Sequence, residues 1–177
     1  MLISLKVHPN KGFTLIELTV SLALIFIAVT PMAYFFTKGS TISKETEVTT
    51  QCLVLAQDLM EEIISKNFEE TPGSFGREAG ESLSNRTNYD DVDDYDGWGP
   101  NNAPECINGA LMDGSGNLPS YSYLRRSVSC QNAANTDFDT IVADGSSDFK
   151  KIEVTVRTVS TYPINVAKTL ETVVSKH

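Results

Sequence analysis

An apolar segment near the N-terminus constrains this chain more than any other feature. It spans residues 13–36, and Glu17 is the only charged side chain within it. An apolar run of about 20 residues is long enough to cross a lipid bilayer as an α-helix. A carboxylate near the start of such a segment is unusual, because an ionisable group inside a membrane span is unfavourable and therefore points to a function. The sequence thus predicts a membrane-anchored chain with a functional acid at the start of its anchor.

Small and basic residues before the segment indicate where it is processed. A secretory signal has a short apolar core that is followed by a small-residue cleavage site. Here the segment is longer than such a core, and no well-matched site follows it. The well-placed small residue is Gly12, which precedes the segment and comes directly after Lys11. A cut after Gly12 would remove residues 1–12 as a leader peptide and leave the apolar helix in place, with Phe13 as its new N-terminus.

The run Gly12-Phe13-Thr14-Leu15-Ile16-Glu17 resembles the cleavage and methylation motif of the type IV pilin and type II secretion pseudopilin family. The resemblance implies cleavage after Gly12 by a prepilin peptidase and N-methylation of Phe13. It also implies assembly with other pilin or pseudopilin subunits through the apolar helix. In that assembly Glu17 would pair with the amine of Phe13 in a neighbouring subunit. Position alone leaves a second interpretation open, in which Glu17 is a helix-end residue near the lipid headgroups and has no partner.

Charge predicts the orientation of the anchor and excludes one class of partner. Lys6 and Lys11 precede the span, so the positive-inside rule puts the N-terminus in the cytoplasm. The chain would then be a single-pass inner-membrane protein with a periplasmic C-terminal domain, which is extracellular if the chain is assembled in a pilus. The net charge of −9 argues against a nucleic-acid partner, because such binding requires a basic surface.

Downstream of the transmembrane helix (residues 13–38), the sequence predicts an α+β domain. Apolar residues at steps of three and four continue the helix over residues 39–68 as an amphipathic helix. These residues are Cys52, Leu55, Ala56, Leu59, Met60, Ile63 and Ile64. Turn-forming residues dominate residues 69–119, which we interpret as a long loop. Antiparallel strands are expected within residues 120–177, so the architecture is pilin-like, with a long N-terminal helix packed on a small C-terminal sheet.

Alternation of apolar and polar side chains locates the strands. It is strongest in residues 150–159, where Ile152, Val154 and Val156 face one way and the polar residues between them face the other. Further strands are expected at about residues 121–131 and 166–174, and a weak candidate lies at 140–143.

Five aspartates are the most distinctive feature of the predicted loop. They are Asp90, Asp91, Asp93, Asp94 and Asp96, and we call residues 90–96 the aspartate run. Carboxylates this close repel one another, so solvent, a cation such as Arg86 or Arg77, or a metal must relieve them. Hard oxygen ligands suit Ca²⁺, although the match to an EF-hand loop is poor. We predict no cofactor, with calcium at these aspartates as the alternative, and favour a structural role in which Arg86 and the tyrosine rings fold the loop onto the sheet.

The same segment carries a second resemblance. The sequence Asp91-Val92-Asp93-Asp94-Tyr95, with Arg86 a few residues before it, is similar to minor pilins of mannose-sensitive haemagglutinin (MSHA) pili, those of type D in particular. This similarity implies a subunit at or near the filament tip that helps to start assembly. The alternative is a membrane-anchored adhesin-like module whose acidic, aromatic loop binds a cation or a carbohydrate.

Three cysteines bear on stability. Cys106 and Cys130 both lie in the globular part, in a compartment that permits disulfides, and we predict that they pair. Cys52 lies on the apolar face of the predicted helix and is expected to be a buried thiol. An alternative is that Cys52 pairs and one of the other two cysteines stays free.

Catalysis finds little support in the sequence. The two histidines are His8, in the predicted leader, and His177, the last residue. The serines of the globular part therefore lack the usual base for nucleophilic catalysis, and we predict that the chain is not an enzyme.

Overall fold

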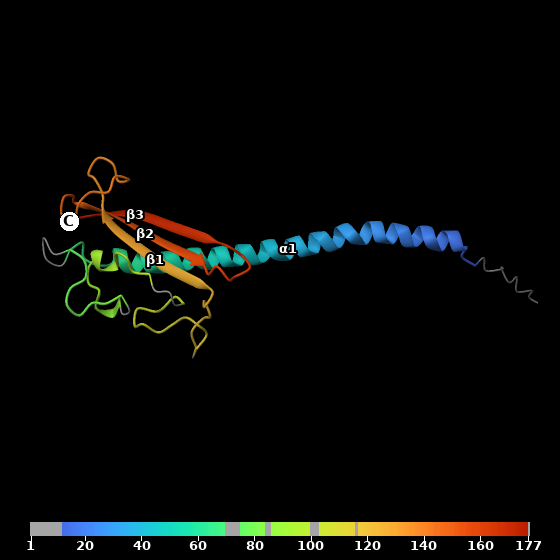
Figure 1. Ribbon diagram of the computed structural model, residues 1–177, viewed down its shortest axis with the longest axis horizontal. Coiled ribbons are helices and arrows are strands. Elements are labelled where there is room, and N and C mark those ends of the chain that lie inside the picture. The colour runs from blue at the N-terminus through green and yellow to red at the C-terminus, as the bar shows by residue number, and fades with distance from the viewer. Residues whose placement is uncertain (1–11, 70–74, 84–85, 100–102, 116, 177) are drawn as a thin grey trace, which may run out of the picture. The chain divides into compact units, whose positions relative to one another are not determined.

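The computed structural model describes residues 12–69, 75–83, 86–99, 103–115 and 117–176 (Figure 1). The chain forms two compact units, Met1–Lys44 and Glu45–His177. Apart from Gly12, the predicted leader lies outside the described residues, as do parts of the predicted loop.

The predicted anchor forms the beginning of helix α1 (Leu15–Ile64), which continues without interruption through Pro31 and Gly39. Its most apolar stretch of 18 residues is not buried. In the described part of the chain, α1 is the one helix long and apolar enough to cross a membrane. The part of α1 in the first unit therefore has the length and surface that the sequence predicts for a membrane anchor.

In the second unit, one face of α1 is buried, as its apolar periodicity predicts. The buried residues are Val48, Cys52, Leu55, Ala56, Leu59, Met60 and Ile63. Two residues differ from the prediction, since Val48 belongs to this face and Ile64 is 47% exposed. The helix ends at Ile64 rather than at residue 68, because the chain turns there and Asn67 pairs with the aspartate run through a bridge to Asp91.

Three strands form an antiparallel sheet in the order β1-β2-β3 (Figure 1). They are β1 (Leu124–Asn132), β2 (Phe149–Thr158) and β3 (Ala167–Ser175). In the central strand the even-numbered positions are buried, which confirms the predicted alternation. The weak candidate at 140–143 forms no strand and contributes only the bridge between Ala133 and Ile141. The second unit is therefore α+β, as the sequence predicts.

The core lies between the buried face of α1 and the sheet, and the loop also contributes to it. From the helix and the strands come residues such as Leu59, Ile63, Ile152 and Val154, all of them fully buried. The loop adds apolar side chains that are 0–2% exposed, namely Tyr89, Val92, Tyr95 and Trp98. The long loop is thus a packed third component of the core, which explains how a connection of this length fits a compact domain.

We expect Leu59→Ala to lower the free energy of unfolding by about 2–5 kcal/mol, because it removes a fully buried side chain and leaves a cavity. The matched control is Leu53→Ala on the same helix, where the leucine is 40% exposed. That control should change the free energy by less than about 1 kcal/mol. Urea unfolding of the detergent-solubilised chain, followed by circular dichroism, measures both, and equal losses would contradict the observed burial.

Candidate functional site

The predicted cleavage point lies directly before α1 and is accessible. Gly12, Phe13 and Thr14 precede the first helical residue. Among the described residues, no atom beyond the immediate chain neighbours of Gly12 lies within 4 Å of the position that a Cβ on Gly12 would occupy, and Phe13 is 83% exposed. The described part of the chain therefore leaves the peptide bond between Gly12 and Phe13 open to an enzyme.

Glu17 caps the start of α1 together with Thr14. Its Oε2 accepts a hydrogen bond from the main-chain N–H of Thr14 (2.9 Å) and another from the Thr14 hydroxyl (2.9 Å). In return, the N–H of Glu17 donates to the Thr14 hydroxyl oxygen at 3.3 Å. This is a capping box, in which a Thr at the helix start and a Glu three residues later satisfy each other's N–H groups. The Thr-x-x-Glu spacing is visible in the sequence, but our sequence interpretation left Glu17 without a partner inside its own chain.

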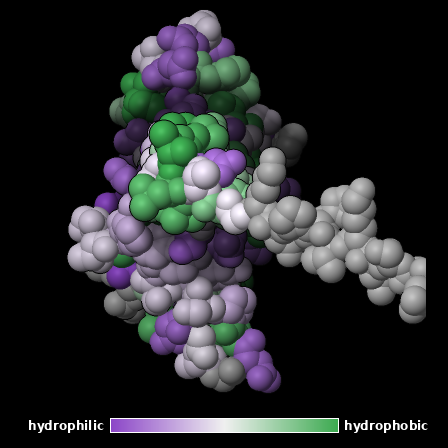
Figure 2. All heavy atoms as spheres, turned by 90° about the vertical axis from the view of Figure 1, so that its right-hand side faces the viewer, coloured by the Kyte–Doolittle hydropathy of each residue, from purple (hydrophilic) through white to green (hydrophobic). Residues whose placement is uncertain are grey.

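The surface of α1 in the first unit is apolar around its whole circumference. Large hydrophobic side chains from Phe13 to Phe36 are exposed by about half or more. In Figure 2 the N-terminal end of α1 faces the viewer as a mainly hydrophobic cluster. A helix that is apolar on all sides is stable only where lipid or protein surrounds it.

Comparison with known families decides the class of this segment. Residues 8–33 match the family model described as the prokaryotic N-terminal methylation motif. The chain carries this motif. The motif supports a type IV pilin-like or pseudopilin subunit that is anchored in a membrane, and it implies processing by a prepilin peptidase and assembly with other pilin subunits. It indicates a structural subunit rather than an enzyme. No curated protein and no solved structure matches the chain.

The aspartate run is folded by its own hydrogen bonds and by one lysine. Asp91 accepts the N–H groups of Asp93 and Asp94 at 3.0 and 3.2 Å. Asp93 pairs with the buried ammonium of Lys150 and accepts the N–H of Gly76 at 2.7 Å. These bonds hold the carboxylates of Asp91 and Asp93 within the folded loop. Neither carboxylate belongs to a group of three or more acidic side chains that converge on one point among the described residues.

Asp96 connects the run to the sheet. Its Oδ1 accepts the N–H of Cys130 on β1 at 2.9 Å, and the carbonyl of Trp98 accepts the N–H of Val128 at 2.7 Å. A Cβ on Gly99 would lie 3.2 Å from the Cβ of Ser127, so the chain passes close to β1 here. The segment from Asp96 to Gly99 therefore covers the outer edge of β1.

One member of the run, Asp94, meets two acids from outside it. Carboxylate oxygens of Glu78, Glu81 and Asp94 lie within 4.8 Å of one another, and we call these residues the acidic triad. Burial raises the pKa of the Asp94 carboxyl to about 6, and the Glu81 carboxyl beside it acts in the same direction. The sequence interpretation missed Glu78 and Glu81, since no local spacing links them to the run.

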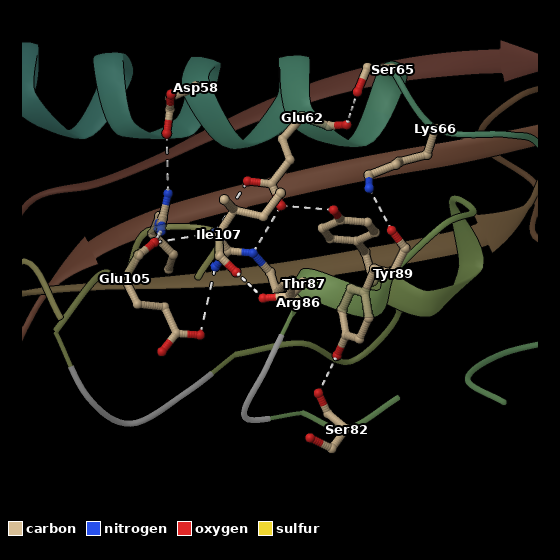
Figure 3. A network of polar contacts seen from close by, with 12 residues as sticks. Asp58, Glu62, Ser65, Lys66, Ser82, Arg86, Thr87, Tyr89, Glu105 and Ile107 are labelled. Carbon is tan, nitrogen blue, oxygen red and sulfur yellow. Dashed lines mark hydrogen bonds and ion pairs between the residues drawn. The ribbon is translucent and has the colours of Figure 1, made fainter. Parts of the chain in front are cut away.

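The second unit also contains a buried network of charges (Figure 3). Arg86, 1% exposed, binds Glu62 of α1 through Nε (3.0 Å) and Nη2 (3.2 Å), and its Nη1 lies 3.8 Å from the carboxylate of Glu105. The guanidinium carbons of Arg86 and Arg126 lie 4.4 and 5.6 Å from the centre of the Trp98 ring. Burial, with Arg86 close by, lowers the pKa of Arg126 to about 10. The network joins α1, the loop and β1.

The loop tyrosines are part of the same network. The hydroxyl of Tyr95 donates to Glu62 at 2.7 Å, and its ring packs edge-on against Tyr89 with the centroids 4.9 Å apart. Burial raises the pKa of Tyr95, and the Glu62 carboxylate raises it further. Arg86 therefore neutralises Glu62 and Glu105 rather than the aspartate run, while Arg77 donates to the carbonyls of Asp94 and Asp96 at 2.6 Å.

All three cysteines carry free thiols in the structure. Cys52 and Cys130 are buried, which raises the pKa of both thiols. The carbonyl of Glu105, the neighbour of Cys106, accepts a hydrogen bond from Arg126, which is four residues from Cys130 along β1. The predicted bond between Cys106 and Cys130 is not formed in this structure. It stays a prediction.

Proposed function

We propose that the chain is a minor pilin or pseudopilin, a structural subunit that joins a type IV pilus or a type II secretion pseudopilus through α1. The observation that carries this proposal is the methylation motif at the start of an exposed apolar helix. Such a helix can move from lipid into a bundle of equivalent helices without exposing its surface to water. A bundle of this kind is the core of a filament.

Processing prepares the subunit for assembly. A prepilin peptidase would cut the accessible bond after Gly12, and Phe13 would then be methylated on its new amine. The inner membrane would hold α1 with the N-terminus in the cytoplasm and the second unit in the periplasm, or outside the cell once a pilus is built. The motif and the open surroundings of Gly12 support the processing, and Lys6 and Lys11 before the span support the orientation.

Glu17 would then select the position of a neighbouring subunit. Its Oε2 accepts both hydrogen bonds from Thr14, which leaves Oε1 able to accept a charge-assisted hydrogen bond from a Phe13 amine. The capping box orients the carboxylate toward the helix start, where such an amine would approach. Capping and pairing are compatible in this proposal.

The aspartate run supports a minor rather than a major subunit. Its similarity to minor pilins of MSHA pili, type D, suggests a place at or near the tip and a part in starting assembly. The adhesin-like alternative has less support, because Tyr89, Tyr95 and Trp98 are buried and present no ring to a carbohydrate. The loop acts as a structural element of the domain in this proposal.

We expect Gly12→Val to abolish leader removal, because a prepilin peptidase would have to accommodate a branched side chain next to the bond that it cuts, whereas the matched control Gly12→Ala should be processed at least partly. The measurement is mass spectrometry of the membrane-extracted chain after co-expression with a prepilin peptidase. The native sequence should begin at Phe13 and carry one additional methyl group. A native chain that keeps residues 1–12 under these conditions would overturn the proposal.

A further inference from the structure

The two outer edges of the sheet differ in how their main-chain groups are satisfied. Along β1, the N–H of Val128 donates to the carbonyl of Trp98 at 2.7 Å, and the N–H of Cys130 donates to the Asp96 carboxylate at 2.9 Å. The loop of the same chain therefore covers the edge of β1. On the opposite side, β3 is the outermost strand, and no described residue pairs with its outer edge (Figure 1). We call this outer edge of β3 the open edge.

The register identifies the main-chain groups of β3 that point outward. In an antiparallel pair, residues that exchange hydrogen bonds with the neighbouring strand alternate with residues whose N–H and C=O groups point away from it. The N–H of Lys176 donates to the carbonyl of Asp148 at 2.8 Å, and the N–H of Thr158 donates to the carbonyl of Val166 at 2.9 Å. Both pairs continue the register of β2 and β3, so the even-numbered residues of β3 bond to β2. The outward groups belong to the odd-numbered residues, which are Ala167, Thr169, Glu171, Val173 and Ser175.

The open edge has the features of a template for a further strand. Natural edge strands are commonly blocked by short length, proline, a bulge or several charged side chains. β3 has nine residues and no proline, its register with β2 contains no bulge, and its only charged side chains are those of Lys168 and Glu171.

The core is also less well covered along β3 than elsewhere. Leu170 and Val174 point toward the core but are only partly buried. Val174 and Phe68 line a cavity of about 710 Å³ between residues that the structure describes. A strand added at the open edge would cover these apolar side chains and would satisfy the outward main-chain groups, which is how sheets bind extended peptides.

Charge indicates which kind of strand fits. On the outer face of the sheet, three carboxylates share the ammonium of Lys151. Those of Asp139, Glu153 and Glu171 lie 3.0, 3.2 and 3.4 Å from it. One positive charge cannot neutralise three negative ones, so the face beside the open edge is acidic. Opposite charges on neighbouring strands attract, and like charges repel. The strand that fits therefore has a lysine or arginine opposite Glu171 and apolar side chains toward the core.

A second copy of β3 does not have this character. Antiparallel pairing of two open edges, centred on Glu171, would place two like carboxylates opposite each other. The other antiparallel registers that join the outward groups would bring one of the remaining odd-numbered residues opposite Glu171. None of these residues is basic.

We propose that the open edge binds a basic, extended segment of a neighbouring filament subunit as a fourth, antiparallel strand of the sheet. The identity of the neighbour rests on the proposed function, since a filament places each subunit beside others. Main-chain hydrogen bonds supply the affinity in this mode of binding, and alternate side chains supply the specificity. The contact joins globular domains directly, in addition to the contacts that α1 makes.

The first test uses a peptide that is blocked at both ends, Thr-Val-Lys-Val-Thr-Val-Thr. Its lysine can lie opposite Glu171 while its valines face the core. Calorimetric titration measures binding to the full chain in detergent. We expect this peptide to bind, and a version with glutamate in place of lysine to bind about fivefold or more weakly. In Glu171→Lys the order of the two peptides should reverse. N-methylation of the main chain at the lysine and at the central threonine should abolish binding, because it removes N–H groups of the new ladder.

A matched pair of variants tests the same ladder from the side of the protein. Thr169→Pro removes one outward N–H but no hydrogen bond to β2, and proline is tolerated on the solvent side of an edge strand. The control Thr169→Ala loses the same hydroxyl, which bonds to that of Thr155 at 2.8 Å, but keeps the N–H. We expect Thr169→Pro to weaken binding of the lysine peptide by about tenfold or more, and Thr169→Ala by less than about twofold. If Thr169→Pro fails to fold by circular dichroism, the N-methylated peptide still decides.

Three results would overturn the proposal. They are the absence of binding of the lysine peptide to the native chain, equal binding of the N-methylated peptide, and a native dimer that Thr169→Pro dissociates, which would assign the open edge to a second copy. In cells that make the filament, Thr169→Pro should be incorporated about tenfold or more less than Thr169→Ala. Equal incorporation of the two variants would contradict the fourth strand and leave the proposed function intact. Absence of the native chain from filaments would instead contradict the proposed function.

Discussion

Replacing Arg86 with alanine will lower the free energy of unfolding of the second unit by about 3–5 kcal/mol. Arg86 is 1% exposed and forms two hydrogen bonds with the carboxylate of Glu62, which is itself 15% exposed. Removal of one partner of a buried ion pair leaves the other as an uncompensated buried charge, and this is why the loss is large. Here two acids lose their partner, because the guanidinium also lies 3.8 Å from the carboxylate of Glu105.

Arg86 also holds the ring of Trp98, so the same variant gives a direct optical signal. Its guanidinium carbon lies 4.4 Å from the ring centre, and Trp98 is the only tryptophan in the chain. Unfolding in urea can therefore be followed by selectively excited tryptophan fluorescence, which reports on the surroundings of Trp98. We expect a lower transition midpoint and an altered emission of Trp98 in the folded state.

Two further variants separate charge from geometry. Arg86→Lys keeps the positive charge but cannot bind a carboxylate through two parallel N–H groups or stack on the indole in the same way, so it should recover only part of the stability. Arg157→Ala removes an arginine from an exposed position of β2 and should change the free energy by less than about 0.5 kcal/mol. A loss of under 1 kcal/mol in Arg86→Ala would show that the network does not stabilise the fold.

The elements with a regular period were predictable, because their residues report on local geometry. The alternation of Ile152, Val154 and Val156 locates the central strand, and steps of three and four locate the buried face of α1. The prediction of where that buried face ends was less accurate. Ile64 fits the period but is exposed, since the helix stops there and the chain turns toward the aspartate run.

The interior of the loop was not predictable, because its contacts join residues that no local pattern connects. Arg86 was expected beside the aspartates but pairs with Glu62, 24 residues earlier in the chain. The acidic triad likewise combines Glu78 and Glu81 with Asp94. The sequence between Glu81 and Asp94 contains Arg86 and Tyr89, which belong to a different set of contacts. Lys150 shares the parity of the buried residues of β2, so its burial was foreseeable, whereas its partner Asp93 was not.

Substituting Glu17 with valine will reduce incorporation of the subunit into filaments by about 100-fold or more, while the leader is still removed after Gly12. Without Glu17, the Phe13 amine of the neighbouring subunit would be left unpaired in an apolar helix bundle, at a cost of several kcal/mol. Each 1.4 kcal/mol corresponds to a factor of ten in the equilibrium constant for assembly. The measurement compares the tagged subunit in sheared filaments with the subunit in membranes, in cells that make the filament. Mass spectrometry of the membrane fraction checks that the leader has been cleaved.

The capping box makes a stricter version of this experiment possible, because Glu17 has two separable roles. Glu17→Gln keeps an oxygen that can accept the N–H of Thr14, and a glutamine at this position is compatible with a capping box. It nevertheless lacks the negative charge, so its loss of assembly should be as large as that of Glu17→Val. Thr14→Val removes the hydroxyl that donates to Glu17 at 2.9 Å but keeps the charge, and it should assemble. If Glu17→Gln assembled normally and Thr14→Val did not, Glu17 would act through the helix start of its own chain, and the proposed pairing with a neighbouring Phe13 amine would be wrong.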